Sequence, residues 1–186
     1  PWVDDIEDQC VDDIDDTVVM TLARKYAELT DVDIHHCEEI TNDSVVAIAD
    51  KCARIQRINL SYCRNITHAS IAHLVKQCAA LTDLNVEWCD QLTVSSFTMV
   101  SENCANLHTF CFGYDDCASV TDESVSALFA GCPKLTSITV YGCRSLTKVV
   151  LPDSITEIRE YGFRGCSSLA SITVPGSVTS IENGAF

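Results

Sequence analysis

Apolar and polar residues follow a pattern that recurs every 26 residues along most of this chain. The stretch LTDVDIHHCEEIT at 29–41 is followed by IQRINLSYCRNIT at 55–67 and LTDLNVEWCDQLT at 81–93. The pattern returns at 107–121, where two extra residues precede the cysteine, and again at 135–147. A fixed period of this size indicates a repeat architecture, in which each unit is one small supersecondary element.

Each unit contains two stretches of different periodicity. The first follows L-x-x-φ-x-φ (φ, an apolar residue) and alternates with period two, which predicts a short strand with one buried face. After the threonine, apolar residues such as Val45, Ile48 and Cys52 fall at helical spacing. The threonine itself stands where a helix N-cap oxygen is needed. A partial unit at 14–26 repeats only the helix pattern, with Tyr26 in the slot of Cys52.

One strand and one helix cannot bury their apolar faces alone, so the units are predicted to stack into a solenoid. The repeated L-x-x-L-x-L-x-x-C-x-x-I/L-T pattern, over about residues 10–146, resembles the cysteine-containing subfamily of leucine-rich repeats. That subfamily is best known from the substrate-binding halves of F-box ubiquitin-ligase receptors. The resemblance implies an α/β fold, a right-handed leucine-rich-repeat solenoid with short parallel strands on its concave face and helices on its convex face.

The period changes at about residue 146. LTKVVLPDSITEIREYGFRGCSS at 146–168 aligns with LASITVPGSVTSIENGAF at 169–186 at a 23-residue step. This second pattern resembles the BspA-like leucine-rich repeat. We therefore predict an acidic N-terminal leader or cap at 1–13, cysteine-containing 26-residue repeats at 14–145, and BspA-like 23-residue repeats at 146–186 that continue the same stack and end in an incomplete unit.

The 12 cysteines of the chain raise two alternatives, a disulfide framework and a set of zinc sites. Nearly every cysteine occupies a repeat slot, either just after the strand or at the end of the helix. Neighbouring strands lie about 4.8 Å apart, but their parallel Cβ vectors keep stacked sulfurs from the dihedral angle of a disulfide. We therefore predict buried, reduced, structural thiols and a cytoplasmic protein. Cys111 falls on an outward-facing strand position and is predicted to be exposed.

Residues 35–41, HHCEEIT, place two histidines, a cysteine and two glutamates side by side, which resembles a metal site. In register with the other units, however, Cys37 is the recurring inward residue, whereas His35 points outward. One unit cannot close this cluster around an ion, so we predict no metal and no cofactor. The chain also lacks G-x-S-x-G, P-loop, H-E-x-x-H and G-x-G-x-x-G motifs, and we predict no catalytic residue.

Outward-facing strand residues line the concave surface of a solenoid, which is its usual binding face. Four units also place a ring at or near the position before the inward cysteine, at His36, Tyr62, Trp88 and Tyr114. Such a ladder of rings either anchors a partner or stacks on itself and shields the turns. The predicted partner-binding residues are Asp33, His35, His36, Arg57, Asn59, Tyr62, Asn85, Glu87, Trp88, Tyr114 and Tyr141.

The formal net charge is −15, and residues 1–16 carry eight acids and no base. Nucleic acids and anionic membrane surfaces attract positive charge, so this balance argues against both as partners. No apolar run approaches the roughly 20 residues that span a bilayer. A protein with a basic surface is the predicted partner. The chain begins at Pro1 and stops within a unit at Phe186, so we expect it to belong to a longer chain or a larger assembly.

These patterns predict a non-catalytic protein–protein interaction module or scaffold that binds on its concave surface. Two alternatives stay open. The resemblance to F-box receptors implies the substrate-recognition arm of a ubiquitin ligase, although residues 1–186 contain no F-box helices. The resemblance to BspA-like repeats implies a surface adhesion protein, which would need a secretion signal that these residues do not show.

Overall fold

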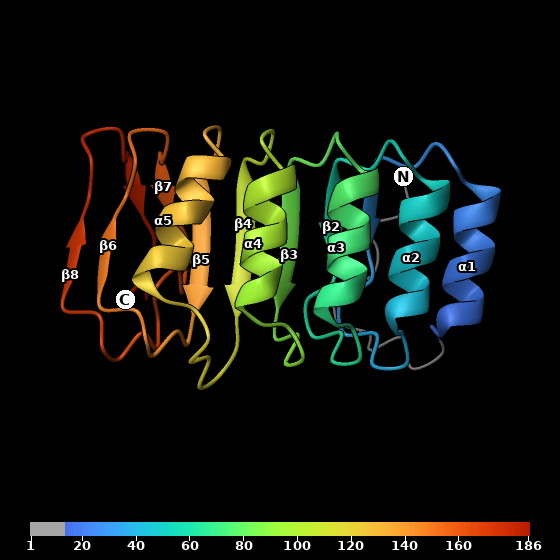
Figure 1. Ribbon diagram of the computed structural model, residues 1–186, viewed down its shortest axis with the longest axis horizontal. Helices are drawn as coiled ribbons and strands as arrows, with labels where there is room; N and C mark the ends of the chain where they lie inside the picture. Colours follow the sequence, from blue (N-terminus) through green and yellow to red (C-terminus); the bar gives the residue numbers. More distant parts are fainter. Residues whose placement is uncertain (1–13) are drawn as a thin grey trace.

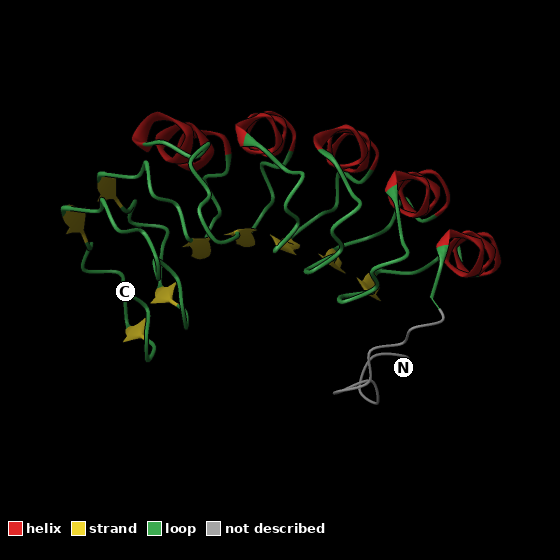
Figure 2. Ribbon diagram, turned by 90° about the horizontal axis from the view of Figure 1, so that it is seen from below, coloured by secondary structure: helices red, strands yellow, loops and turns green. Residues whose placement is uncertain are grey.

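The structure is a computed structural model that describes residues 14–186, so the predicted leader at 1–13 lies outside the described residues. The chain forms a curved solenoid, with helices along the outer, convex side and a row of strands along the inner, concave side (Figure 1, Figure 2). The α/β repeat solenoid predicted from the sequence is therefore confirmed.

The convex layer consists of ten-residue helices that each begin at a capping side chain. Thr41, Thr67 and Thr93 accept a hydrogen bond from the backbone N–H two residues further on, which satisfies one of the free donors of a helix start. Tyr26 ends the first helix in the slot that Cys52 fills in the next, as predicted. Within the described residues the helices are α1 (Asp16–Lys25), α2 (Asn42–Lys51), α3 (His68–Gln77), α4 (Val94–Asn103) and α5 (Asp122–Gly131).

The first residue of a helix also contacts the capping threonine of the next unit. The Asp16 carboxylate accepts hydrogen bonds from the backbone nitrogen of Thr41 at 2.9 Å and from its hydroxyl at 2.7 Å. The amide oxygen of Asn42 accepts the same backbone bond from Thr67 at 2.8 Å. These contacts join the start of α1 to that of α2 and the start of α2 to that of α3.

The concave layer is a parallel sheet in which each strand pairs with the strand of the next unit. Its order is β1-β2-β3-β4-β5, without crossovers within the sheet. The register places Asp33, Asn59 and Asn85 in one row across the strands. The strands are β1 (Asp31–Asp33), β2 (Arg57–Asn59), β3 (Asp83–Glu87), β4 (Thr109–Gly113) and β5 (Ser137–Tyr141).

Strands replace the helices of the convex side after α5, in the part of the chain that the structure describes. Two layers of short strands continue the stack: β6 follows α5 on the convex side and pairs with β8, while β7 follows β5 on the concave side and pairs with β9 (Figure 2). Asp122 of α5 accepts a hydrogen bond from the backbone nitrogen of Thr147 at 2.7 Å and thereby joins the two kinds of unit. These strands are β6 (Lys148–Val150), β7 (Glu157–Ile158), β8 (Ser171–Thr173) and β9 (Ser180–Ile181).

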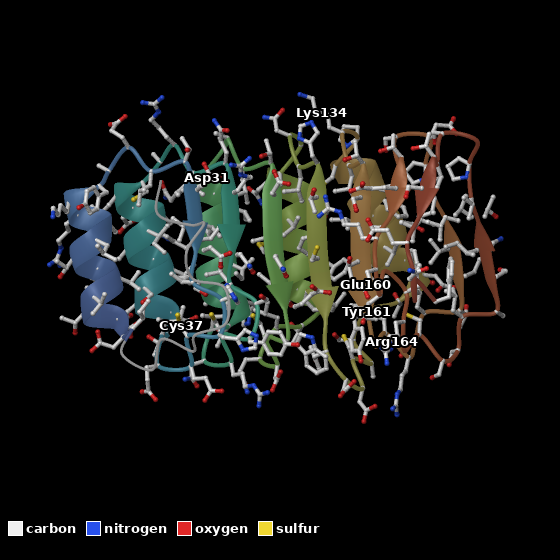
Figure 3. All side chains as sticks on the ribbon, turned by 180° about the vertical axis from the view of Figure 1, so that it is seen from behind. Asp31, Cys37, Lys134, Glu160, Tyr161 and Arg164 are labelled. Carbon is white, nitrogen blue, oxygen red and sulfur yellow. The ribbon has the colours of Figure 1, made fainter. Side chains whose placement is uncertain are left out.

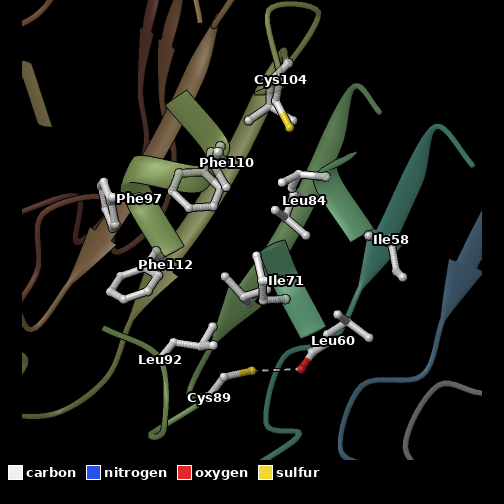
Figure 4. Packing of buried hydrophobic residues seen from close by; sticks show 14 of the residues in the cluster. Ile58, Leu60, Ile71, Leu84, Cys89, Leu92, Phe97, Cys104, Phe110 and Phe112 are labelled. Atoms are coloured by element: carbon white, nitrogen blue, oxygen red, sulfur yellow. Dashed lines mark hydrogen bonds between the residues drawn. The ribbon is translucent and has the colours of Figure 1, made fainter. Parts of the chain in front are cut away.

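One continuous apolar core runs between the two layers from end to end of the described chain. Each unit contributes the inward residues of its strand and the inner face of its helix. At the fourth unit the Phe97 ring meets those of Phe110 and Phe112 edge to face, with 4.7 Å between the ring centroids of Phe97 and Phe112 (Figure 4). Such contacts add to the stabilisation that burial of these rings already provides.

The inward cysteines connect successive units through their thiols. Cys63 donates to the carbonyl oxygen of Ile34 at 3.2 Å, and Cys89 donates to that of Leu60 at 3.1 Å (Figure 4). A small, weakly donating side chain suits this slot, because it fills the core and still meets a strand-end carbonyl. The predicted inward position of these cysteines is confirmed, since both are fully buried.

The fourth unit interrupts this thiol ladder. Cys117 lies next to Ser119, with 3.7 Å between sulfur and hydroxyl oxygen. A hydrogen bond with the Cys143 thiol lowers the pKa of Cys117, despite the opposing effect of burial. The ladder resumes at Cys166, which donates to the carbonyl of Val140 at 3.0 Å. The two-residue insertion before Cys117 coincides with the break.

Candidate functional site

Polar side chains form a hydrogen-bonded network across the first two strands of the concave face. Arg57 on β2 pairs with Asp31 on β1. Asn59 donates to the Asp33 carboxylate at 3.2 Å, and Nδ1 of His35 lies 2.6 Å from the same carboxylate. The residues predicted from sequence as one face therefore do lie side by side, and they hold one another in place.

A shallow hollow of about 260 Å³ lies over the middle of this network. Its polar lining comes from four strands and from one residue beyond them, Arg159, which follows β7. The charged and amide residues of its lining are Asp33, Arg57, Asn59, Asp83, Asn85 and Arg159. The hollow thus has carboxylate, amide and guanidinium groups on its walls.

The far half of the concave face is covered. Thr109, Ser137 and Thr139 point outward from β4 and β5, yet all three are buried. The prediction that Cys111 is exposed is wrong, because only 8% of it is accessible, and burial raises the pKa of its thiol to about 12. Arg159 lines the hollow beside Cys111. A side chain from a later unit therefore shields a position on β4 that the alternation within that strand predicts to be exposed.

Aromatic rings form a continuous stack along one edge of the concave face, which we call the ring row: His36, Tyr62, Trp88 and Tyr141. The ring centroids of His36 and Tyr62 are 3.9 Å apart, those of Tyr62 and Trp88 5.4 Å, and those of Trp88 and Tyr141 5.0 Å. Of the two alternatives predicted for these rings, the one in which they stack on each other therefore describes their packing. Their outer edges stay partly accessible, so stacking leaves room for a partner.

The backbone turn before each inward cysteine positions these rings. His36, Tyr62 and Trp88 have φ angles of 58°, 64° and 59°, in the left-handed region that non-glycine residues rarely adopt. In the fourth unit Asp116 occupies that turn instead, because the two inserted residues lie before it in the chain.

The prediction that Tyr114 belongs to the ladder is therefore wrong. The Tyr114 ring lies 6.4 Å from that of Phe112, and its hydroxyl donates to the carbonyl oxygen of Leu92 at 3.4 Å. Tyr141 takes its place in the row.

Gly113 makes that replacement possible. It pairs in register with Glu87 on one side and Tyr141 on the other. A Cβ atom at this position would lie 2.0 Å from the Tyr141 carbonyl oxygen. With no side chain at Gly113, the Tyr141 ring reaches past β4 to Trp88.

Glu87 ends β3 directly beside this gap. Burial raises the pKa of its carboxyl group to about 7. Among residues 14–186, no group donates a hydrogen bond to its carboxylate and no cation pairs with it. The other carboxylates of this face have partners, since Asp31 pairs with Arg57 and Asp33 with His35.

The HHCEEIT cluster separates into three environments. His35 bonds to Asp33, His36 stacks on Tyr62, and Cys37 is buried in the core. Within the described residues, no group of three or more histidine, cysteine or acidic side chains is placed to hold a metal ion. The row of outward residues, rather than a metal cluster, accounts for this stretch.

Sequence reasoning missed the basic and aromatic residues that the last units bring to this edge. Tyr161 has a φ angle of 59°, and the Arg164 guanidinium lies 4.8 Å from its ring centroid. Figure 3 shows both at the same edge of the molecule as Cys37, opposite the edge of Asp31 and Lys134. The Tyr-Gly pairs at 141–142 and 161–162 are the signal that could have found Tyr161.

Comparisons with known proteins agree with this architecture. Residues 139–186 match the family model described as BspA type Leucine rich repeat region (6 copies). A chain of the crystal structure of the Rad7 and Elc1 complex in yeast superposes with a TM-score of 0.64 at 23% sequence identity. That alignment covers 73% of this chain but only 35% of the other. No curated protein matches.

The repeat architecture and the match over residues 139–186 define the class of fold: the chain forms a leucine-rich-repeat solenoid. The match to the BspA type over residues 139–186 includes residues 146–186, for which the 23-residue pattern predicts this type. No helix within residues 14–186 has the length and apolar character to cross a membrane.

Proposed function

We propose that this chain is a non-catalytic protein-interaction module that binds its partner on the open half of the concave face. The surface comprises the outward residues of β1 to β3 and the adjoining ring row. The observation that carries the proposal is the preformed character of this surface. Asp31, Asp33, Arg57 and Asn59 hold one another across neighbouring strands, so a partner meets groups that are already oriented, and little ordering entropy is lost on binding.

Composition supports the choice of a protein partner. The net charge of −15 disfavours polyanions and favours a basic protein surface. The rings at the edge supply the aromatic contact area that protein interfaces use as anchors. Leucine-rich-repeat solenoids display such concave faces for recognition, and the likeness to a chain from a protein complex is consistent with this role.

A charge placed in the centre of the face tests the proposal. Asn85 lies on β3 and lines the hollow, so Asn85→Arg would add a long cationic side chain there. Gln77→Arg at the exposed end of α3 is the matched control on the convex side. Proteins captured by the wild-type chain would be identified, and each would then be titrated against the purified variants.

We expect Asn85→Arg to weaken binding at least tenfold and Gln77→Arg to leave it unchanged. Circular dichroism would verify that both variants are folded. Equal binding by the wild type and Asn85→Arg would overturn the proposal, since the partner would then use another face. The two open alternatives, a ubiquitin-ligase arm and an adhesion protein, use the same face and differ in the domains that would accompany it.

A further inference from the structure

The Glu87 carboxylate lacks the compensation that burial of a charge requires. Removing a carboxylate from water costs free energy unless hydrogen bonds or an opposite charge replace the lost solvation. Among residues 14–186, Glu87 receives neither. Its neighbours across the sheet offer no cation, because the in-register residue on β4 is Gly113 and the position on the other side is Ser61, two residues beyond β2.

The surroundings of Glu87 fit a planar cation. Its charge acts on the Tyr62 hydroxyl: burial is the largest cause of the raised pKa of Tyr62, and the negative charge of Glu87 raises it further. Trp88 follows Glu87 in the chain, and its ring meets that of Tyr141 beyond the Gly113 gap. A guanidinium group pairs with a carboxylate through two parallel hydrogen bonds and packs against aromatic rings, whereas an ammonium group is a compact, strongly hydrated point charge.

We propose that Glu87 and the rings of Tyr62, Trp88 and Tyr141 form a receptor site for an arginine side chain of the partner. This inference rests on the proposed function and specifies its chemistry: the partner presents an arginine from an extended or loop segment to the end of β3. Binding would supply the cation that Glu87 lacks, and the in-register residue on β4, Gly113, has no side chain that could pair with the carboxylate instead.

Charge on the rest of the face favours one cation at this point. Asp31 and Glu157 already have arginine partners within the chain, at Arg57 and Arg159. The Asp83 carboxylate accepts a hydrogen bond from the Thr82 hydroxyl at 2.7 Å. A partner arginine therefore gains most at Glu87, where it adds the first opposite charge and displaces no internal ion pair.

The test uses the full chain and a fluorescein-labelled peptide, GSGRGSG, with matched peptides in which citrulline or lysine replaces arginine. Citrulline keeps the planar shape without the charge, and lysine keeps the charge without the planar fork. Binding would be followed by fluorescence anisotropy at 0.15 M salt, with the Trp88 indole resonance as a local reporter. Glu87→Gln removes the charge, and Asp90→Asn removes an equal charge from an exposed position just beyond the turn.

We expect the arginine peptide to bind more tightly than the lysine peptide, and the citrulline peptide not to bind. Glu87→Gln should reduce arginine binding at least tenfold, and Asp90→Asn should leave it unchanged. Equal losses in the two variants would show general attraction to an acidic protein and would overturn the inference. So would full binding by Glu87→Gln.

A pH series adds a readout that general attraction would not give. Glu87 must be ionised to pair with arginine, so affinity of the wild type should rise between pH 6 and 8. The titratable groups on which the charge of Glu87 acts are Tyr62 in the turn after β2, Cys111 on β4 and the inward Cys89, and burial raises the pKa of all three. His36 stacks on Tyr62 rather than contacting Glu87. This histidine is also present in the Glu87→Gln variant, so its effect on binding is the same in both proteins. Only the part of the pH dependence that Glu87→Gln removes therefore reports on Glu87.

The two proposals can fail separately. If Asn85→Arg abolishes binding of a natural partner while Glu87→Gln has no effect on that partner or on the arginine peptide, the concave face is the binding surface and the arginine site is not. If neither substitution weakens the natural partner, both proposals are wrong.

Discussion

The Tyr141 ring lies 5.0 Å from the Trp88 ring, although the whole of β4 separates their strands. Three of the four rings of the ring row come from consecutive units, and the fourth, Tyr141, comes from the fifth unit, beyond one that contributes no ring. The contact passes Gly113, where the chain has no side chain to obstruct it. The edge of the concave face is therefore continuous even though one unit contributes no ring to it.

Substitution of Gly113 should destabilise the protein strongly. Gly113→Ala would place a Cβ atom 2.0 Å from the Tyr141 carbonyl oxygen at a φ angle of 131°. Steric overlap and backbone strain each cost roughly 1–3 kcal/mol, so we expect a loss of about 3 kcal/mol in the free energy of unfolding, measured with urea. Gly176→Ala is the control, because a Cβ atom there meets nothing within 4 Å. Similar losses in both variants would contradict the close approach at Gly113.

Glu87 should make the stability of the protein depend on pH. Burial raises the pKa of this carboxyl group from 4.5 to about 7, so between these values the unfolded chain releases its proton while the folded chain keeps it. The free energy of unfolding then falls as pH rises through this window.

The substitution Glu87→Gln removes this dependence. The variant should match the wild type at pH 4 and be more stable at pH 8 by about 2 kcal/mol, less than the full conversion of the shift because water still reaches part of the side chain. Urea unfolding at pH 4, 6 and 8 would measure the difference. A difference that stays constant over this range would be evidence against a raised pKa.

The thiol ladder should contribute to stability through its bonds to carbonyl groups. Cys89→Ala removes a fully buried sulfur and its bond to the Leu60 carbonyl. We expect a loss of about 1–2 kcal/mol from the combined packing and hydrogen-bond effects. Cys111→Ala should cost less, because that thiol lies on the other side of the sheet, outside the ladder. If Cys111→Ala costs as much in thermal and urea unfolding, the ladder has no special role.

The contact between helix starts should respond to both substitution and acid. Burial raises the pKa of Asp16, but hydrogen bonds from Ser44 and Thr41 outweigh this effect and leave the pKa lowered. The stabilisation is therefore present above the unfolded value of 3.8 and is lost as pH falls through the lower folded value.

Two substitutions at Asp16 separate charge from hydrogen bonding. Asp16→Ala should destabilise the protein by about 2 kcal/mol at pH 7, since hydrogen bonds to a charged acceptor are lost. Asp16→Asn should cost less, because Asn42 makes the equivalent contact with an amide oxygen. Equal losses in the two variants, measured by urea unfolding, would mean that the amide does not replace the carboxylate.

The units were predictable because each repeats the same local physics. Alternation fixed which strand residues face the core, and the threonine and cysteine marked where each helix begins and ends, as Thr41 and Cys52 do. The predicted outward row of Asp33, Asn59 and Asn85 follows from the same period. These features depend on neighbouring units only through stacking, so one unit predicts the next.

The errors arose where one unit reaches over another. Cys111 is buried beside Arg159, which comes from a later unit, so the pattern of its own strand could not reveal the cover. The small outward residues Thr109 and Ser137 indicated that another part of the chain packs closely over these strands, but alternation within a strand does not predict such a contact. Tyr114 was misplaced because the sequence does not say on which side of the turn an insertion is absorbed.

The insertion in the fourth unit shows where this solenoid tolerates extra chain. The two added residues fall between the end of β4 and the left-handed turn at Asp116, and the inward Cys117 still returns to the core, fully buried. A loop of foreign sequence grafted at this point would project beside the ring row while the stack beneath keeps its spacing. The fourth unit thus marks an engineering position from which a new recognition segment could be presented next to the natural binding face.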